Sequence, residues 1–521
     1  MKKIVSLLLF LVVCSTGLYA KEYDINLSGV IKKEYKLSDE ISYNLGEKVS
    51  FKTIKWGKYK SYDKESEVGT YNPNDGSENF IATSGEYSEK EGFMLLNEKD
   101  TIPLDKKFAE CIEFQIASVD DMWQSGIITQ VIPNILEKKG LQKELRREME
   151  MDALEYISTI KKNNLDLEDP LLESYIYELI SKILPKELID GRSTDINILI
   201  VKDDMCNVAM YPNGTLVLHS GMLSTIKTED ELVAILAHEI AHYVLNHSVD
   251  NVNSALTRKK RAEFWAAVAT GLTAIVEGVV AANNSDYIPG AATLSMASLS
   301  SRVGDMVVDR LGMKYNHKQE QEADRYACNA LKLLGYDENA MASALERIRV
   351  IDEKEQENSS YVESYTHPAL VERIELCGKP KNDYNQSFEC MMALPIKYTA
   401  ELKYANRRYR QAISIADINI KNKVALPNEY AIRINSSLAL CNQNGVDLLQ
   451  EINSARMLYP QSLILAECEI KVYIRLKDYN KVLSLLGEYE TALNETSHSN
   501  AILEKQQWIE SIRRRCKLYA Q

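Results

Sequence analysis

Apolar residues at helical spacing dominate the middle of the chain. Segments 144–162 and 170–184 carry them three and four positions apart, which is typical of amphipathic helices. Two other segments differ: 196–201 is a compact apolar strand, and 208–219 holds two apolar runs joined by Pro212-Asn213-Gly214. Asn-Gly favours the positive φ values of a tight turn, so 208–219 is predicted to be a hairpin. We therefore expect a small mixed sheet among helices.

The sheet is followed by a segment with a clear helix start. Thr228 and Glu231 form a Thr-x-x-Glu capping box, and an apolar series at helical spacing follows immediately. We expect this helix to run to about Asn246. Another helix is predicted to begin near His317.

The N-terminal region has a different texture. Residues 21–115 are rich in Tyr, Lys, Ser, Glu and Gly, with short alternating stretches and turn signals. This pattern predicts a β-rich or loosely ordered region.

The C-terminal region, residues 393–521, is helical in pattern to its end. Tyr409 and Tyr479 lie in similar contexts 70 residues apart, and Pro427 and Pro460 lie 33 apart. Both separations suit the period of about 34 residues of tetratricopeptide helix hairpins. A plain helical bundle is the alternative.

These patterns together predict the fold class. We expect a mainly α protein with a small mixed β-sheet, in which an α+β domain over residues 140–380 is followed by an all-α helical-repeat domain over residues 393–521.

The first twenty residues are organised as a secretory signal. A lysine pair precedes the apolar run 4–13, and a segment of small residues ends at Ala20. We expect cleavage after Ala20 and export to the periplasm or cell envelope. A lipid anchor on Cys14 is an alternative, although Val13 stands where lipoprotein signals have a small residue. An uncleaved membrane anchor is disfavoured because the apolar run is short.

Charge and cysteine spacing exclude several classes of protein. Beyond residue 20 the chain has 60 basic and 75 acidic residues, a net charge of −15, which gives no nucleic-acid-binding surface. The eight remaining cysteines show no Cys-x-x-Cys, so a zinc ribbon or thioredoxin-like motif is excluded. Export allows disulfides, and Cys377 and Cys390 are the nearest pair, with free thiols as an equal alternative.

The segment His238-Glu239-Ile240-Ala241-His242 carries the candidate chemistry. Histidines four residues apart lie on one helix face, about one turn apart, where both can reach one metal. Glu239 is placed to take a proton from water on that metal. The alternative is a pair of buried histidines satisfied by hydrogen bonds in the core.

A catalytic zinc takes three protein ligands and leaves a position for water, so one more ligand is needed. His247 is one residue off the register of a metzincin histidine and is expected to face another way. The nearby acids downstream are Glu263, Glu277, Glu320 and Glu322. Only Glu320 has an acid four residues on, Asp324, which can orient a ligand histidine from one turn along the same face. A solvated acidic helix start is the alternative.

At this point the chain resembles the zinc metallopeptidase family that includes HtpX, the CAAX prenyl proteases and the BepA-type periplasmic proteases. The resemblance spans about residues 165–378. Its matching pieces are the segments 213–218, 221–223, 238–242, 320–324 and Thr366-His367-Pro368 with Arg373.

The resemblance implies a set of roles. His238, His242 and Glu320 would bind Zn²⁺, with Glu239 as the general base. His367 and Arg373 would approach the site from a later loop, where either can stabilise an oxyanion. A fourth zinc position is the alternative for His367, as is simple packing of its loop; a structural salt bridge is the alternative for Arg373.

The apolar stretch Phe264 to Ala282 is 19 residues long, enough to cross a bilayer. The family's integral-membrane members have spans in this part of the domain, whereas the BepA-type members have a covering segment. Glu277 and several small residues favour a lid or a peripheral membrane contact over a span.

We therefore expect a zinc-dependent endopeptidase of the cell envelope that hydrolyses misfolded or misassembled envelope proteins. The strand 215–219 is expected to offer an edge to which an extended substrate adds. The repeat domain would hold a client or an envelope assembly partner. The alternatives are a chaperone-like binding protein with an autoinhibited zinc site, and a prenyl-protein processing enzyme, which the signal and weak hydropathy disfavour.

Overall fold

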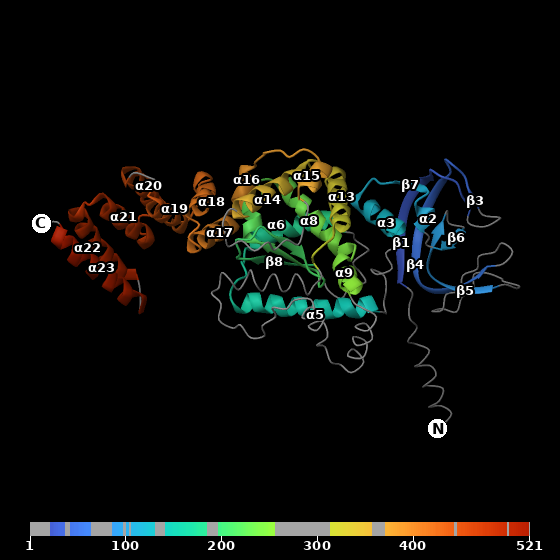
Figure 1. Ribbon diagram of the computed structural model, residues 1–521, viewed down its shortest axis with the longest axis horizontal. Helices are drawn as coiled ribbons and strands as arrows, with labels where there is room; N and C mark the ends of the chain where they lie inside the picture. Colours follow the sequence, from blue (N-terminus) through green and yellow to red (C-terminus); the bar gives the residue numbers. More distant parts are fainter. Residues whose placement is uncertain are drawn as a thin grey trace, which may run out of the picture.

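The structure is a computed structural model of the chain. The residues that it describes are 21–36, 42–63, 86–96, 100–103, 106–130, 141–184, 196–255, 313–356, 370–441, 445–496 and 500–519. The expected signal, the apolar stretch 264–282, Glu263 and His367 lie outside them. Figure 1 shows the described chain running along its long axis from an N-terminal sheet, through a central domain, to a row of C-terminal helices.

The N-terminal region contains a five-stranded antiparallel sheet and a short hairpin. The strand order in the sheet is β6 (Asp100–Pro103), β5 (Glu86–Leu96), β4 (Lys48–Asp63), β1 (Lys21–Ile31) and β7 (Ile112–Gln115). The hairpin joins β2 (Tyr35–Lys36) to β3 (Ser42–Tyr43). Its rings Tyr35 and Tyr43 each pack 5.0 Å from the ring of Phe108, in the short helix α2 (Lys106–Ala109).

Helix α3 (Val119–Gln130) joins this sheet to the central domain. The indole of Trp123 stacks on Tyr326 with the ring centroids 4.8 Å apart, and its N–H donates to the carbonyl of Ile183 at 2.9 Å. A buried indole needs such a partner for its N–H. The two regions therefore share one continuous core.

The central sheet has three strands, β8 (Asn197–Val201), β10 (Thr215–His219) and β9 (Val208–Met210), in that order. The predicted hairpin is confirmed, because β9 and β10 pair antiparallel and Gly214 adopts φ +80° in the turn. The expectation that 215–219 offers an edge is wrong. Strand β8 pairs with β10 in parallel, which places β10 in the centre and leaves β9 at an edge.

Alternate residues of this sheet face two different cores, as the period of a strand requires. On one side, residues such as Leu216 and Leu218 pack with helices α6 (Pro170–Ile183) and α8 (Glu229–Val244). On the other side, Leu199, Val201 and Val217 pack with helix α5 (Leu141–Lys162). Figure 1 shows the resulting layers, with the sheet between α5 below and α6 and α8 above.

Gly221 makes a close approach possible directly after β10, in helix α7 (Ser220–Thr225). Its N–H donates to the carbonyl of Asp203 at 2.8 Å, and a Cβ at this position would lie 2.3 Å from the carbonyl oxygen of Met205. We expect Gly221→Ala to lower the free energy of unfolding by about 1–3 kcal/mol in urea titrations, because the backbone must move. A matched control is Gly487→Ala, where an added Cβ meets nothing within 4 Å. Equal stability of the two variants would contradict this reading.

The remaining described elements are helices. Those of the central domain are α9 (His247–Ala255), α13 (His317–Leu334), α14 (Ala340–Gln356), α15 (Leu370–Cys377) and α16 (Gln386–Met391). Those beyond it are α17 (Ala393–Ala405), α18 (Tyr409–Lys421), α19 (Pro427–Leu440), α20 (Gly445–Leu458), α21 (Leu463–Leu476), α22 (Tyr479–Thr496) and α23 (Asn500–Tyr519).

The expected fold class is confirmed: the chain is mainly α, with small sheets ahead of a C-terminal helical region. Within the described residues, no helix combines the length and apolarity that crossing a bilayer requires.

The eight cysteines from Cys111 to Cys516 are all free, so the pairing of Cys377 with Cys390 is wrong. The side chain of Cys377 instead hydrogen-bonds with Cys328 of α13. Nearness in sequence is a poor guide here, because α15 packs along α13 and places a residue 49 positions away beside Cys377.

Candidate metal centre

Helix α8 is held firmly at its N-terminus. The Oγ1 of Thr228 accepts the N–H of Glu231 at 3.2 Å, as the predicted cap requires. The carboxylate of Glu231 reaches back one residue further than a capping box does and accepts the N–H of Lys227 at 2.7 Å. Arg347 of α14 also binds this carboxylate at 2.8 Å. Burial raises the pKa of Glu231 although these hydrogen bonds oppose it.

The two histidines of α8 meet one carboxylate of α13. The Nε2 atoms of His238 and His242 lie 3.0 Å apart, and each lies 3.6 Å from one oxygen of Glu320. All three side chains are buried. Within the part of the chain that the structure describes, these residues form the single group of three or more potential donors whose atoms all lie within 4.8 Å of one another.

This spacing fits a tetrahedral metal. Zinc bonds to imidazole nitrogen and carboxylate oxygen of about 2.0–2.2 Å place neighbouring donors about 3.3 Å apart. The observed separations of 3.0 and 3.6 Å bracket that value. The donor set of two imidazoles and one carboxylate is also one that catalytic zinc sites use.

Helix α13 delivers Glu320 by way of a strong N-terminal cap. The side chain of Asn316 accepts the N–H groups of Lys318 and Gln319, and Gln319 returns a bond to the N–H of Asn316, which confirms a helix beginning at His317. Asp324 lies one turn after Glu320, and its Oδ1 is 2.9 Å from Nδ1 of His238. A proton on Nδ1 puts the lone pair of His238 on Nε2, the nitrogen that faces the metal position.

Arg373 of α15 binds the carboxylates of both Glu320 and Asp324. Its Nε and Nη2 each donate to Asp324 at 2.7 Å, and its Nη1 lies 2.6 Å from Glu320. Only 1% of Arg373 is exposed. Burial alone would raise the pKa of Asp324, yet the hydrogen bonds from Arg373 and His238 hold that pKa well below its usual range.

Glu239 points toward the edge of the central sheet. Its Oε2 accepts the backbone N–H of Met210, the last residue of β9, at 3.2 Å, and the side chain is buried. Glu239, the residue after His238 in α8, thus contacts the edge strand β9.

His247 does not belong to the metal donor group, as its register predicts, but its contact with His242 was not predicted from the sequence. Its Nδ1 lies 2.9 Å from Nδ1 of His242, and its Nε2 lies 3.5 Å from Glu322. The reason is Asn246, which adopts φ +67° between α8 and α9 and turns the chain back. Asn tolerates the left-handed region better than most residues, so this Asn was the available signal.

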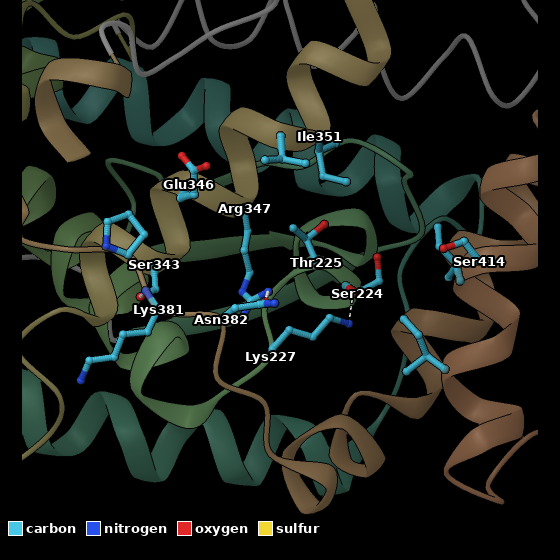
Figure 2. Close-up of a pocket in the computed structure, with 14 residues that line it drawn as sticks. Ser224, Thr225, Lys227, Ser343, Glu346, Arg347, Ile351, Lys381, Asn382 and Ser414 are labelled. Atoms are coloured by element: carbon cyan, nitrogen blue, oxygen red, sulfur yellow. Dashed lines mark hydrogen bonds between the residues drawn. The ribbon is translucent and has the colours of Figure 1, made fainter. Parts of the chain in front are cut away.

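A separate cavity of about 560 Å³ lies between α7, α14 and α18. Figure 2 shows Lys227 and Arg347 reaching into it, with Ser414 on the side that α18 forms. Both cations have carboxylate partners: Lys227 lies 3.1 Å from Glu389, and Arg347 binds Glu231. The lining of the cavity includes none of the three metal donors, so the cavity is distinct from the metal centre.

Comparison with known proteins places this centre in a family. Residues 173–379 match the family model described as peptidase family M48. The beta-barrel assembly-enhancing protease of Escherichia coli (strain K12) is 25% identical over 248 residues, which are 47% of this chain and 45% of that protein. Metalloprotease LoiP of the same strain is 27% identical over 187 residues, 36% of this chain and 62% of LoiP.

A mitochondrial relative also matches. The metalloendopeptidase OMA1 of Schizosaccharomyces pombe (strain 972 / ATCC 24843) is 24% identical over 213 residues, 40% of this chain and 54% of OMA1. The match to the beta-barrel assembly-enhancing protease covers less than half of that protein's length. Members of family M48 are zinc-dependent. The matched segment includes the histidine pair, both carboxylates and Arg373, and the chain therefore contains a metallopeptidase domain of peptidase family M48 at residues 173–379.

Proposed function

We propose that the protein is a zinc-dependent endopeptidase of the cell envelope that cleaves misfolded or misassembled proteins. The observation that carries this proposal is the convergence of His238, His242 and Glu320, with Glu239 beside them at a strand edge. Such an arrangement would place a bound metal and a general base beside a strand edge along which a peptide backbone can lie.

Each residue has a role in this mechanism. His238 and His242 would hold zinc through Nε2, and Glu320 would hold it through its carboxylate. When bound, zinc polarises the scissile carbonyl and lowers the pKa of water. Glu239 accepts the proton of the attacking water and then delivers it to the leaving amine. Asp324 keeps the proton of His238 on Nδ1.

We assign Arg373 a positioning role. Its Nε, Nη1 and Nη2 already face Glu320 and Asp324, so it serves better as their counter-charge than as an oxyanion donor. For His367 we keep two roles, oxyanion stabilisation and a fourth zinc position that closes the resting enzyme. His367→Ala lowers the cleavage rate in the first case and raises it in the second.

The edge of β9, rather than β10, is our proposed place for the substrate. Strand addition uses backbone hydrogen bonds, so it tolerates many sequences. Among the described strands, β9 pairs only with β10, and Met210 at its end contacts Glu239. An extended chain lying along β9 would pass next to the proposed base.

We also propose partners and a cellular location for the protein. Helices α17–α23 are proposed to form tetratricopeptide-like hairpins that bind a client or an envelope assembly partner, which the name of the beta-barrel assembly-enhancing protease suggests. We also propose that residues 1–20 direct export; the apolar stretch 264–282, for which the sequence predicts a lid or a peripheral membrane contact, lies outside the described residues. The large acidic excess argues against a nucleic-acid partner.

Metal removal tests this proposal. Zinc-loaded protein is expected to cleave unfolded casein, and dialysis against 1,10-phenanthroline should abolish cleavage, which stoichiometric zinc restores and magnesium does not. The reason is that the donor set suits zinc, whereas magnesium prefers an octahedral shell of oxygens. Zinc-loaded protein that binds casein without cleaving it would contradict the enzyme and favour a chaperone-like binding protein.

A further inference from the structure

The two histidines of α8 have different partners behind them. Nδ1 of His238 faces the carboxylate of Asp324 at 2.9 Å. Nδ1 of His242 faces another imidazole, that of His247, at 2.9 Å. All three rings are buried, so these contacts lie away from bulk solvent.

The direction of the hydrogen bond between His242 and His247 follows from the metal. A histidine that binds zinc through Nε2 must carry its proton on Nδ1. Nδ1 of His242 is therefore the donor, and Nδ1 of His247 must be the acceptor. A neutral His247 then has its own proton on Nε2, where Glu322 lies 3.5 Å away. Each hydrogen-bond donor in the series therefore faces an acceptor.

The surroundings of His247 fix this arrangement. Gln319 of α13 donates its side-chain N–H to the carbonyl of His247 at 3.3 Å and to Asn251 at 2.9 Å. Tyr315 stacks on the ring of His242, with the centroids 3.6 Å apart. The ring of His242 is thus held by Tyr315 on one face and by His247 at Nδ1.

We propose that His247 and Glu322 are positioning residues that fix the tautomer and orientation of His242 for zinc. The series Glu322, His247, His242 is the counterpart of Asp324 and His238, lengthened by one imidazole. This inference rests on the proposed zinc site and adds a function to two residues outside its ligand set. Loss of such an outer partner lowers metal affinity by about 10–100-fold.

Zinc affinity of the full chain, measured by competition with a chromophoric chelator, tests the role. His247→Leu removes the acceptor and is expected to raise the Kd for zinc by about 10–100-fold. His247→Asn places an amide oxygen close to the position of Nδ1 and is expected to restore most of the affinity. If His247 only filled space, the Leu and Asn variants would bind zinc with equal affinity. His317→Leu is the matched control, because His317 is exposed and pairs with Glu372 on the surface.

A second measurement reads the proton directly. In zinc-loaded protein with ¹⁵N-labelled histidine, the ring signals of His247, assigned by their loss in His247→Asn, should show the proton on Nε2. A proton on Nδ1 of His247 would overturn the proposal, as would equal zinc affinities of wild type and His247→Leu.

Two further outcomes are separable. If His247→Leu does not fold, Glu322→Ala decides, because this carboxylate is only partly buried: a weaker zinc affinity supports the series and an unchanged one overturns it. If wild type itself binds no zinc, the proposed function fails. If wild type binds zinc and His247→Leu binds it equally well, only the role of His247 fails.

Discussion

Glu239→Gln should lose peptide-bond cleavage almost completely and still bind one zinc per chain. General-base catalysis contributes about 10²–10⁴-fold to a rate, and a carboxamide cannot accept the proton. The variant keeps an oxygen that can accept the N–H of Met210, so the surrounding structure should persist. Casein cleavage and zinc content, the latter by mass spectrometry of the metal, measure the two effects separately.

The control for this prediction is Glu375→Gln, which removes an exposed carboxylate from α15 of the same domain. It should cleave casein at the wild-type rate. Cleavage by Glu239→Gln at more than about one hundredth of the wild-type rate would remove Glu239 from the role of base. Loss of zinc from that variant would instead show that Glu239 helps to hold the metal.

Arg373→Met should have the largest effect on stability of any single change in the metal centre. It leaves Glu320 and Asp324 buried without their guanidinium, and breaking a buried ion pair from one side costs about 3–5 kcal/mol. Urea unfolding of metal-free protein measures the loss. Zinc should recover part of it, because the metal supplies positive charge to Glu320.

Two further variants serve as comparisons for Arg373→Met. Arg373→Lys keeps the charge but cannot present the planar fork that binds Asp324 through two nitrogens, so an intermediate loss is expected. Arg325→Met removes a largely exposed guanidinium that lies 3.5 Å from Glu322, and exposed pairs contribute about 0–1 kcal/mol. If Arg373→Met unfolds at the same urea concentration as Arg325→Met, Arg373 does not serve as the counter-charge.

Local rules were enough to predict the elements that carry the metal donors. The cap at Thr228 and the four-residue spacing of His238 and His242 indicate a helix with both rings on one face, and α8 has this form. The same spacing singled out Glu320 through Asp324. These features depend only on the geometry of one helix, which sequence spacing determines directly.

What the sequence could not reveal depends on packing between distant segments. No local sequence pattern predicts that β8 pairs in parallel with β10. This pairing places β10 inside the sheet, so the available edge is that of β9 and not that of β10. Cys328 and Cys377 meet because two helices pack along each other. His247 returns to His242 through a single left-handed residue, Asn246, which helical periodicity treats as one more step along α8.

The most direct measurement is a crystal structure of the full protein with anomalous data collected at the zinc absorption edge. We predict one peak about 2.0–2.2 Å from Nε2 of His238, Nε2 of His242 and the carboxylate of Glu320. The same experiment on Glu320→Gln should show a weak peak or none. A zinc peak elsewhere in the chain, or an empty position between these three residues in zinc-soaked crystals, would contradict the proposed metal centre.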